Sequence, residues 1–148
     1  MGEVLIDTNI LVYAHDPADP AKRDRAIDAL DALVESGLGR ISAQIAGEFI
    51  AATTKGRRPI LTLERALAQA TLLCETFPVF DLTRFIVLEA ARGVREYRLS
   101  YYDAQVWATA RLNQLPTIFT EDFETGRRID GVQFLDPLQS GFDLSHWR

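Results

Sequence analysis

An apolar run that ends in an acid constrains the fold of this chain more than any other feature. Segment 4–6 is fully apolar, is followed by Asp7, Thr8 and Asn9, and leads into a second apolar segment, 10–14. Successive apolar positions predict a strand that is buried on both faces, as in a parallel sheet. Asp7 would then stand at the carboxyl end of that strand, where ligands bind in open α/β sheets. Taken alone, Asp7 is better explained as the N-cap of the helix that follows, and it is the other acids further along the chain that favour a functional site.

Helical and strand-like segments alternate along the rest of the chain. Apolar periodicity, caps and breakers predict helices from Pro20 to before Gly37, from after Ser42 to before Gly56, and over 62–76, 83–97 and 100–113. Short strands are expected over 39–42, 77–81, 117–120 and 132–135. This alternation predicts an α/β fold, a three-layer α/β/α sandwich whose central sheet is mainly parallel. With neither repeat nor linker, we expect one domain over 1–148, with 139–148 as a peripheral tail despite Trp147.

Composition narrows the functional class. The chain has 148 residues, 47% of them hydrophobic and 25% charged, which is ordinary for a soluble globular protein. Its net charge of −5 argues against general coating of nucleic acid. The N-terminus lacks the layout of a signal peptide, and no apolar run is long enough to span a membrane. The single cysteine, Cys74, excludes an internal disulfide, fits a reducing cytoplasm, and is expected to be buried and inert.

Apolar spacing also predicts which helical faces are buried. In the helix over 83–97, we expect Val87, Leu88, Ala91 and Val94 to face inward, with the arginines elsewhere.

Four acids are candidates for a site: Asp7, Glu48, Asp103 and Asp122. Glu48 lies on or beside an apolar helical face, where a carboxylate is costly unless it is paired. Asp103 could belong to a capping box that begins at Ser100, and Asp122 could cap a short helix. Together, however, four carboxylates facing one crevice would raise one another's pKa, and a divalent cation would relieve the repulsion. All-oxygen ligation suits Mg²⁺ or Mn²⁺ rather than zinc.

These motifs, in this order, resemble those of PIN-domain ribonucleases. The resemblance is carried by the stretch 5–11 (LIDTNIL), by Glu48-Phe49, by Asp103-Ala104 and by the stretch 120–123 (TEDF), and it covers almost the whole chain. The chain length matches the VapC toxins of type II toxin–antitoxin systems. The resemblance implies that Asp7, Glu48, Asp103 and Asp122 bind the metal, with Thr8, Asn9 and Thr120 shaping the site. Glu121 is adjacent and could take the place of Asp122.

The resemblance also implies an activity and partners. The activity is Mg²⁺- or Mn²⁺-dependent cleavage of RNA by a metal-activated water, which leaves 5′-phosphate and 3′-hydroxyl ends and needs no side-chain nucleophile. The partners are an RNA substrate, an antitoxin and a second copy of the chain. Apolar groups expected to be exposed for the antitoxin are Phe49, Ile50, Ile60 and Leu61.

Basic clusters could hold RNA or an acidic partner. They are Lys55, Arg57 and Arg58; Arg92, Arg95 and Arg98; and Arg127 and Arg128. The alternative for each is ordinary solvated surface charge.

Two other functions compete with the nuclease. A receiver-like phosphoacceptor domain would need a second acid near Asp7 and a lysine after a late strand, whereas both lysines, Lys22 and Lys55, lie in the first half of the chain. A non-catalytic PIN-like module would bind RNA or protein only, and metal titration distinguishes it from an enzyme.

Overall fold

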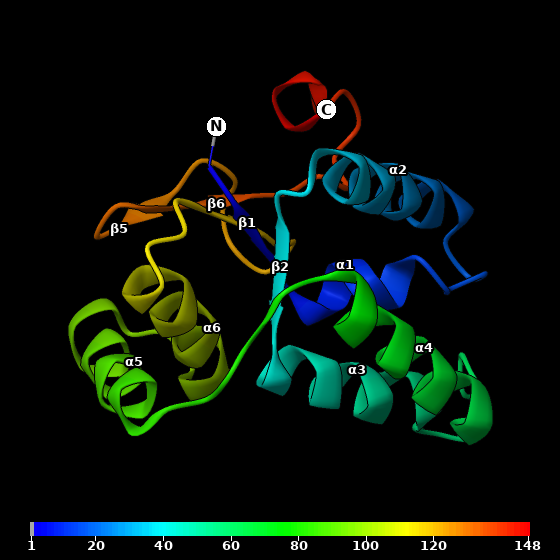
Figure 1. Cartoon of the computed structure of the whole chain (residues 1–148), viewed down its shortest axis with the longest axis horizontal. Helices are drawn as coiled ribbons and strands as arrows, with labels where there is room; N and C mark the ends of the chain where they lie inside the picture. Colours follow the sequence, from blue (N-terminus) through cyan, green and yellow to red (C-terminus); the bar gives the residue numbers. More distant parts are fainter. Residues whose placement is uncertain (1) are drawn as a thin grey trace.

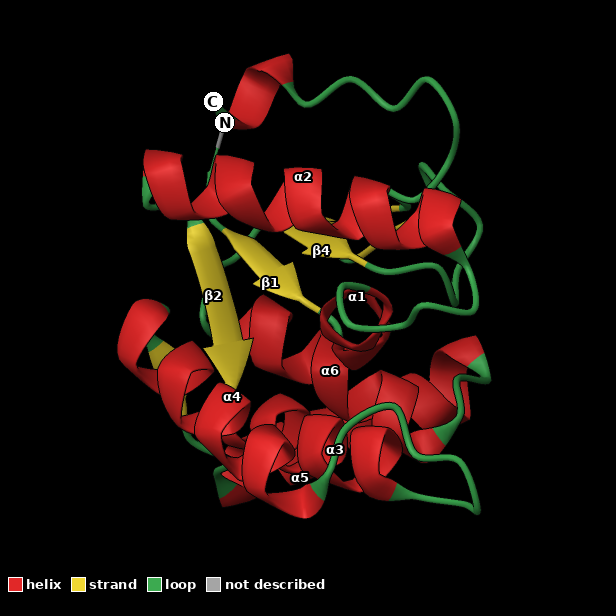
Figure 2. Cartoon of the chain, turned by 90° about the vertical axis from the view of Figure 1, so that its right-hand side faces the viewer, coloured by secondary structure: helices red, strands yellow, loops and turns green. Residues whose placement is uncertain are grey.

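In a computed structural model that describes residues 2–148, six strands form one sheet with helices on both of its faces (Figure 1). The strands are β1 (Val4–Ile6), β2 (Gly39–Ser42), β3 (Val79–Phe80), β4 (Thr117–Phe119), β5 (Arg128–Ile129) and β6 (Val132–Leu135). The helices are α1 (Thr8–Tyr13), α2 (Pro20–Ser36), α3 (Ala43–Thr54), α4 (Leu63–Thr76), α5 (Arg84–Tyr97), α6 (Tyr101–Leu112) and the 3₁₀ turn η1 (Ser145–Trp147). The predicted three-layer α/β architecture is confirmed, with α2 above the strands and α3 to α6 below them in Figure 2.

The middle of the sheet is the pair of strands β1 and β4. The sheet order is β3-β2-β1-β4-β6-β5, and every pair is parallel except the β5–β6 hairpin. Val4 lies opposite Thr117 and Ile6 opposite Phe119, and both strands are buried throughout. Because the strands run in the same direction, their carboxyl ends meet at one edge, where the amide of Asp7 donates to the carbonyl of Phe119 at 2.9 Å.

The helix boundaries follow the predicted caps. Asp19 accepts from the amide of Lys22 at the start of α2, and Gly37 ends that helix with φ of 72°. A glycine suits this position because other residues rarely adopt the left-handed conformation. Ser42 caps α3 in the same way, through the amide of Ile45. None of the helices within residues 2–148 is long and apolar enough to cross a membrane.

The predicted inward face of α5 is wrong. Leu88 is 67% exposed, Val87 and Val94 are each 37% exposed, and Ala91 is also exposed. The helix instead buries Ile86, Ala90 and Gly93. A methyl group added at Gly93 would lie 2.8 Å from the ring of Trp107 in α6, so the two helices cross more closely than a large side chain would allow.

Two smaller expectations are also wrong. Cys74 is exposed, because α4 turns its small residues, Ala66 and Ala70, toward the core. The tail is not wholly peripheral, because Trp147 is only 3% exposed and its ring packs edge-on against Phe119, with 5.1 Å between centroids. The end of the chain therefore covers part of β4.

Candidate active site

All four candidate acids line a single cavity of about 370 Å³ at the carboxyl edge of the sheet. Asp7 follows β1, Glu48 lies on α3, Asp103 lies in the first turn of α6, and Asp122 follows β4. Thr8, Asn9 and Glu121 line the same cavity. The fold thus brings together acids that are up to 115 residues apart in the sequence, since Asp7 and Asp122 follow the carboxyl ends of the two central strands.

Asp7 is the most deeply buried of the four acids, at 5% exposure. Its Oδ1 accepts from the amide of Thr8 at 2.7 Å, so the predicted capping of α1 is real. Its Oδ2 accepts from the hydroxyl of Thr120 at 2.8 Å, across to the next strand. Burial raises the pKa of Asp7 from 3.8 to about 7, and the charges of Asp122 and Asp103 add to this rise. Capping alone does not explain a buried carboxylate at this position. An asparagine caps a helix equally well and carries no charge that burial would destabilise.

Glu48 is held by two donors. Its Oε2 accepts from the hydroxyl of Thr8 at 2.9 Å, and its Oε1 accepts from the side-chain amide of Gln44 at 2.8 Å. The same amide lies 3.3 Å from the backbone oxygen of Tyr102. Gln44 therefore links α3 to the first turn of α6, next to Asp103, and it was not anticipated from the sequence.

The capping explanations of Asp103 and Asp122 are not supported. Ser100 makes no side-chain hydrogen bond at the start of α6, so no capping box forms there. Residues 121–127 form bends and a turn and contain no helix, so Asp122 has no helix to cap. Both acids instead face the cavity.

Hydrogen bonds distinguish Asp122 from its neighbour Glu121. Asn9 donates to Oδ2 of Asp122 at 3.0 Å and to the hydroxyl of Thr120 at 3.2 Å, which ties the acid to the site. Partial burial and the charge of Asp103 raise the pKa of Asp122. Glu121 instead pairs with Nζ of Lys22 at 2.9 Å. Local sequence carries no signal for this pair, because the two residues are 99 positions apart.

The donor set fits a hard divalent cation. All four acids supply oxygen, and none of the residues lining the cavity is a lysine, arginine or histidine. Burial is the main cause of the raised pKa of Asp7 and of Asp122, neighbouring acids add to it, and a bound cation would lower both pKa values. Within residues 2–148, no three His, Cys, Asp or Glu side chains lie close enough together to form a metal site in this structure.

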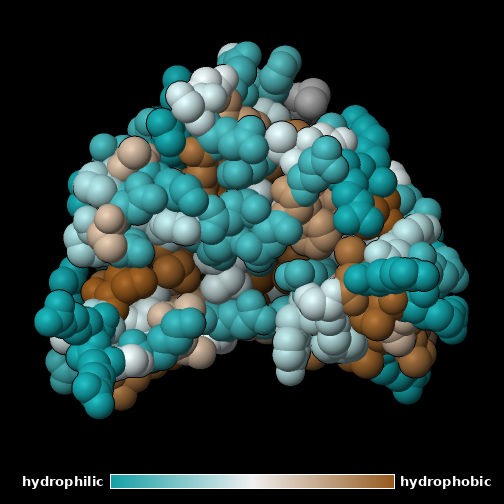
Figure 3. Space-filling view, turned by 180° about the vertical axis from the view of Figure 1, so that it is seen from behind, coloured by the Kyte–Doolittle hydropathy of each residue, from teal (hydrophilic) through white to brown (hydrophobic). Residues whose placement is uncertain are grey.

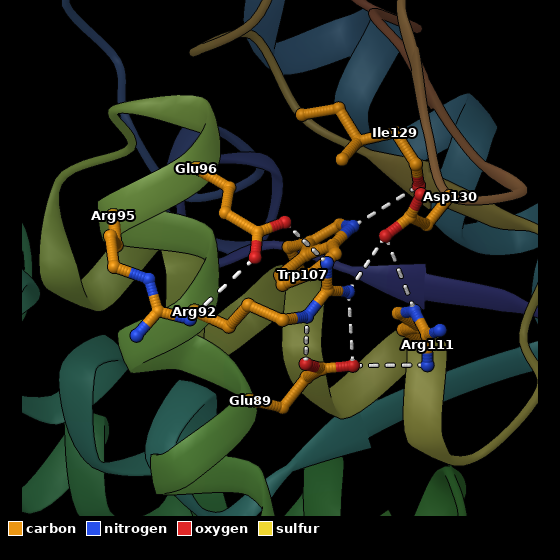
Figure 4. Close-up of polar contacts among 8 residues, drawn as sticks. All are labelled: Glu89, Arg92, Arg95, Glu96, Trp107, Arg111, Ile129 and Asp130. Carbon is orange, nitrogen blue, oxygen red and sulfur yellow. Dashed lines mark hydrogen bonds and ion pairs between the residues drawn. The ribbon is translucent and has the colours of Figure 1, made fainter.

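The basic residues proposed for RNA binding lie outside the cavity. Lys55, Arg57 and Arg58 are exposed in the loop after α3. Arg92 is already committed to ion pairs with Glu89, Glu96 and Asp130, drawn in Figure 4. Its guanidinium also lies over the ring of Trp107, 5.4 Å from the centroid. Arg92 therefore stabilises the packing of α5, whereas Arg95 is 75% exposed and makes a longer contact of 3.6 Å with Glu96.

Two of the expected antitoxin contacts are buried. Phe49 is fully buried and Leu61 is 4% exposed, because both side chains belong to the hydrophobic core. Ile50 and Ile60 are half-buried. Larger exposed apolar groups lie on α4 and α5, among them Leu63 at 60% and Leu88 at 67%. Figure 3 shows hydrophobic surface on both lower flanks of the rear face, with hydrophilic surface between them.

Comparisons with known proteins agree with this architecture. A family model described as the PIN domain matches residues 4–131. A toxin–antitoxin complex from Klebsiella pneumoniae contains a chain with a TM-score of 0.66 and 23% identity, and the match covers 91% of this chain and 98% of that one. VapC20 from Mycobacterium tuberculosis is described as a sarcin–ricin loop cleaving toxin. It has a TM-score of 0.64 and 17% identity, and the match covers 81% of this chain and 90% of that one. A DNA-bound VapBC from Salmonella typhimurium has a TM-score of 0.64 and 20% identity, and the match covers 93% of this chain and 99% of that one.

At these identities, the likeness to solved structures establishes the fold. No curated protein matches the sequence. The observed strand order also differs from the 2-1-3-4-5 order of receiver-like domains, which removes that alternative.

Proposed function

This chain belongs to the PIN domain family, and from that premise we propose that it is a metal-dependent ribonuclease that cleaves RNA phosphodiester bonds with a metal-activated water. The observation that carries the proposal is the gathering of Asp7, Glu48, Asp103 and Asp122 around one cavity. A set of carboxylates without a histidine or a cysteine supports hydrolysis by an activated water rather than by a protein nucleophile.

The four acids would hold Mg²⁺ or Mn²⁺. When bound, the ion would neutralise phosphate charge, lower the pKa of a water and align the attacking and leaving oxygens. Neutral donors orient three of the acids: Thr120 for Asp7, Thr8 for Glu48 and Asn9 for Asp122. Each carboxylate oxygen keeps a further lone pair for an ion, because it can accept more than one bond.

Asp122, not Glu121, would be the fourth acid. Lys22 neutralises Glu121 at the rim of the cavity, whereas Asn9 holds Asp122 without neutralising it. An ion would therefore gain more from Asp122, whose charge is uncompensated.

We further propose that the chain is the toxin of a toxin–antitoxin pair in the cytoplasm, and that it forms a homodimer. The likeness to chains from toxin–antitoxin complexes supports this role. A groove beside Ala46, Ile50, Leu67 and Ala70, between α3 and α4, offers an apolar surface for the antitoxin. Phe85, 61% exposed, and Leu88 on α5 offer a second such surface, for the other copy. A basic side chain of the antitoxin could enter the acidic cavity and block it.

Variants of the acids test the proposal. Asp7→Asn, Glu48→Gln, Asp103→Asn and Asp122→Asn should each abolish cleavage of single-stranded RNA in Mg²⁺ or Mn²⁺. Asp28→Asn, an exposed acid of α2 outside the cavity, should cleave at the wild-type rate. Wild-type cleavage by any well-folded variant of the four acids would remove that acid from the site.

A non-catalytic RNA- or protein-binding module is the second candidate. The spacing of the acids favours it, because no three His, Cys, Asp or Glu side chains within residues 2–148 are close enough together to hold a metal ion. Titration with Mn²⁺ discriminates: the nuclease should bind the ion through these four acids, and a non-catalytic module should not.

A further inference from the structure

One wall of the acidic cavity is apolar. Part of the lining comes from Val12, Ala52 and Val106, and Tyr102, with 65% of its surface exposed, lines the same cavity. Ligation of a metal ion requires only the carboxylates, so it does not account for an aromatic ring and an aliphatic wall at the same site. Such surfaces bind flat, apolar faces through stacking and dispersion.

Neighbouring groups hold Tyr102 in place beside the acids. It directly precedes Asp103, and its backbone oxygen lies 3.3 Å from the amide of Gln44, which also donates to Glu48. The ring of Tyr101 meets that of Tyr102 edge-on, with 5.3 Å between centroids and 79° between planes. Tyr102 is therefore an exposed ring whose backbone is tied to the acidic site.

The cavity contains one other aromatic residue, Tyr13, which is already engaged. The ammonium of Lys22 lies over its ring, 5.0 Å from the centroid, and that lysine is fixed by Glu121. Tyr102 is therefore the ring available to a ligand.

We propose that Tyr102 stacks on the nucleobase next to the scissile phosphate, and that this contact positions the RNA strand for cleavage. This inference rests on the proposed ribonuclease activity. In a duplex, both faces of each base are covered by its neighbours, whereas bases in loops and single strands can be splayed onto aromatic side chains. Stacking of this kind tolerates any base, because every base has an aromatic face.

The lining of the cavity supports a stacking contact. It holds the buried Asp7 together with the exposed ring of Tyr102, so a strand whose phosphate approaches the acids carries its base to the same site. None of the lining residues is basic, so the lining offers this base no cation.

The experiment combines a protein change with a substrate change. A short single-stranded RNA is cleaved by the wild-type chain, its cut site is mapped, and the nucleotides on either side are replaced one at a time by abasic ribonucleotides. At one position, base removal should lower the wild-type kcat/KM about 5- to 150-fold. Tyr102→Ala should lose a similar factor on the intact RNA, mainly through KM, and should show no further loss on the abasic RNA.

Matched variants separate stacking from a structural effect. Tyr102→Phe keeps the ring and should stay within about twofold of the wild type, because stacking does not need the hydroxyl. Val34→Ala removes exposed apolar surface from α2, outside the cavity, and should change nothing. A 2-aminopurine at the sensitive position should be quenched by the wild type and by Tyr102→Phe, but not by Tyr102→Ala.

Several results would overturn the inference. They are wild-type kinetics for Tyr102→Ala, an undiminished abasic penalty in that variant, or quenching of 2-aminopurine by Tyr102→Ala as strong as that by the wild type. In each of these cases the ribonuclease proposal survives, because cleavage is still observed. If the wild type cleaves no RNA in Mg²⁺ or Mn²⁺, the ribonuclease proposal itself fails and the stacking inference falls with it.

Discussion

Replacement of Asp7 by asparagine should stabilise the metal-free protein while abolishing its activity. Burial raises the pKa of Asp7 from 3.8 to about 7, so the folded state holds this proton more tightly than the unfolded state. Below about pH 4 the carboxyl is neutral in both states and costs nothing. As the pH rises from 4 through 7, ionisation favours unfolding, and the cost approaches ~4 kcal/mol, since each pKa unit corresponds to ~1.4 kcal/mol.

Asparagine removes that cost but disturbs one hydrogen bond. Its oxygen can still accept from the amide of Thr8, while its NH₂ group would face the hydroxyl of Thr120. That hydroxyl already accepts from Asn9 and from the amide of Asp122. The mismatch should cost ~1–2 kcal/mol. The net effect at pH 8 is a gain of ~2–3 kcal/mol, or about 4–12 °C in Tm for a chain of this size.

The assay is thermal unfolding in EDTA from pH 4 to pH 8, with RNA cleavage in Mg²⁺ measured on the same preparation. The difference in Tm between Asp7→Asn and the wild type should be zero or negative at pH 4 and should become positive as the pH rises through 7. Asp28→Asn, an exposed control, should show no such trend. A difference that does not change with pH, or a variant that is less stable at pH 8, would refute the claim that the buried charge destabilises the apo protein.

Four further substitutions test other parts of the account. Asp122→Asn should abolish cleavage, whereas Glu121→Gln should retain most of it because Lys22 neutralises Glu121. Equal effects of the two changes on the cleavage rate would contradict the assignment of Asp122 as the fourth acid. Gly93→Ala should lower the urea midpoint by an amount equivalent to ~1–3 kcal/mol, since the added methyl group would lie 2.8 Å from the neighbouring indole ring. Trp147→Ala should cost ~3–5 kcal/mol in the same assay, and a surface-like effect below ~0.5 kcal/mol would show that the tail does not belong to the core.

The parts of the site that could be predicted are those that follow from the sheet. Apolar runs before Asp7 and Asp122 mark two buried strands, and parallel strands bring their carboxyl ends to one edge. Thr120 and Asn9 were predicted as site-shaping residues because they belong to the same two motifs, and both donate to site acids. The sheet accounts for the meeting of Asp7 and Asp122, whereas Glu48 and Asp103 were added by the resemblance of the ordered motifs to those of PIN-domain ribonucleases.

What could not be predicted depends on contacts between distant residues. The larger apolar groups of α5 were expected inside, but the close crossing at Gly93 and Trp107 selects the small face of the helix. The pair between Lys22 and Glu121 joins α2 to the end of β4, and no local pattern marks it. Trp147 packs on Phe119 only because the tail returns across the sheet.

The central claim, that carboxylates of this chain use a divalent ion to cleave RNA, is tested most directly by one titration. Purified wild-type protein is stripped with EDTA, and cleavage of an unstructured RNA is followed as Mg²⁺ or Mn²⁺ is added back. The account predicts no cleavage in EDTA, recovery to a plateau as the free ion rises, and no recovery in Asp7→Asn. Undiminished cleavage in persistent excess EDTA, or recovery in Asp7→Asn equal to that of the wild type, would contradict it.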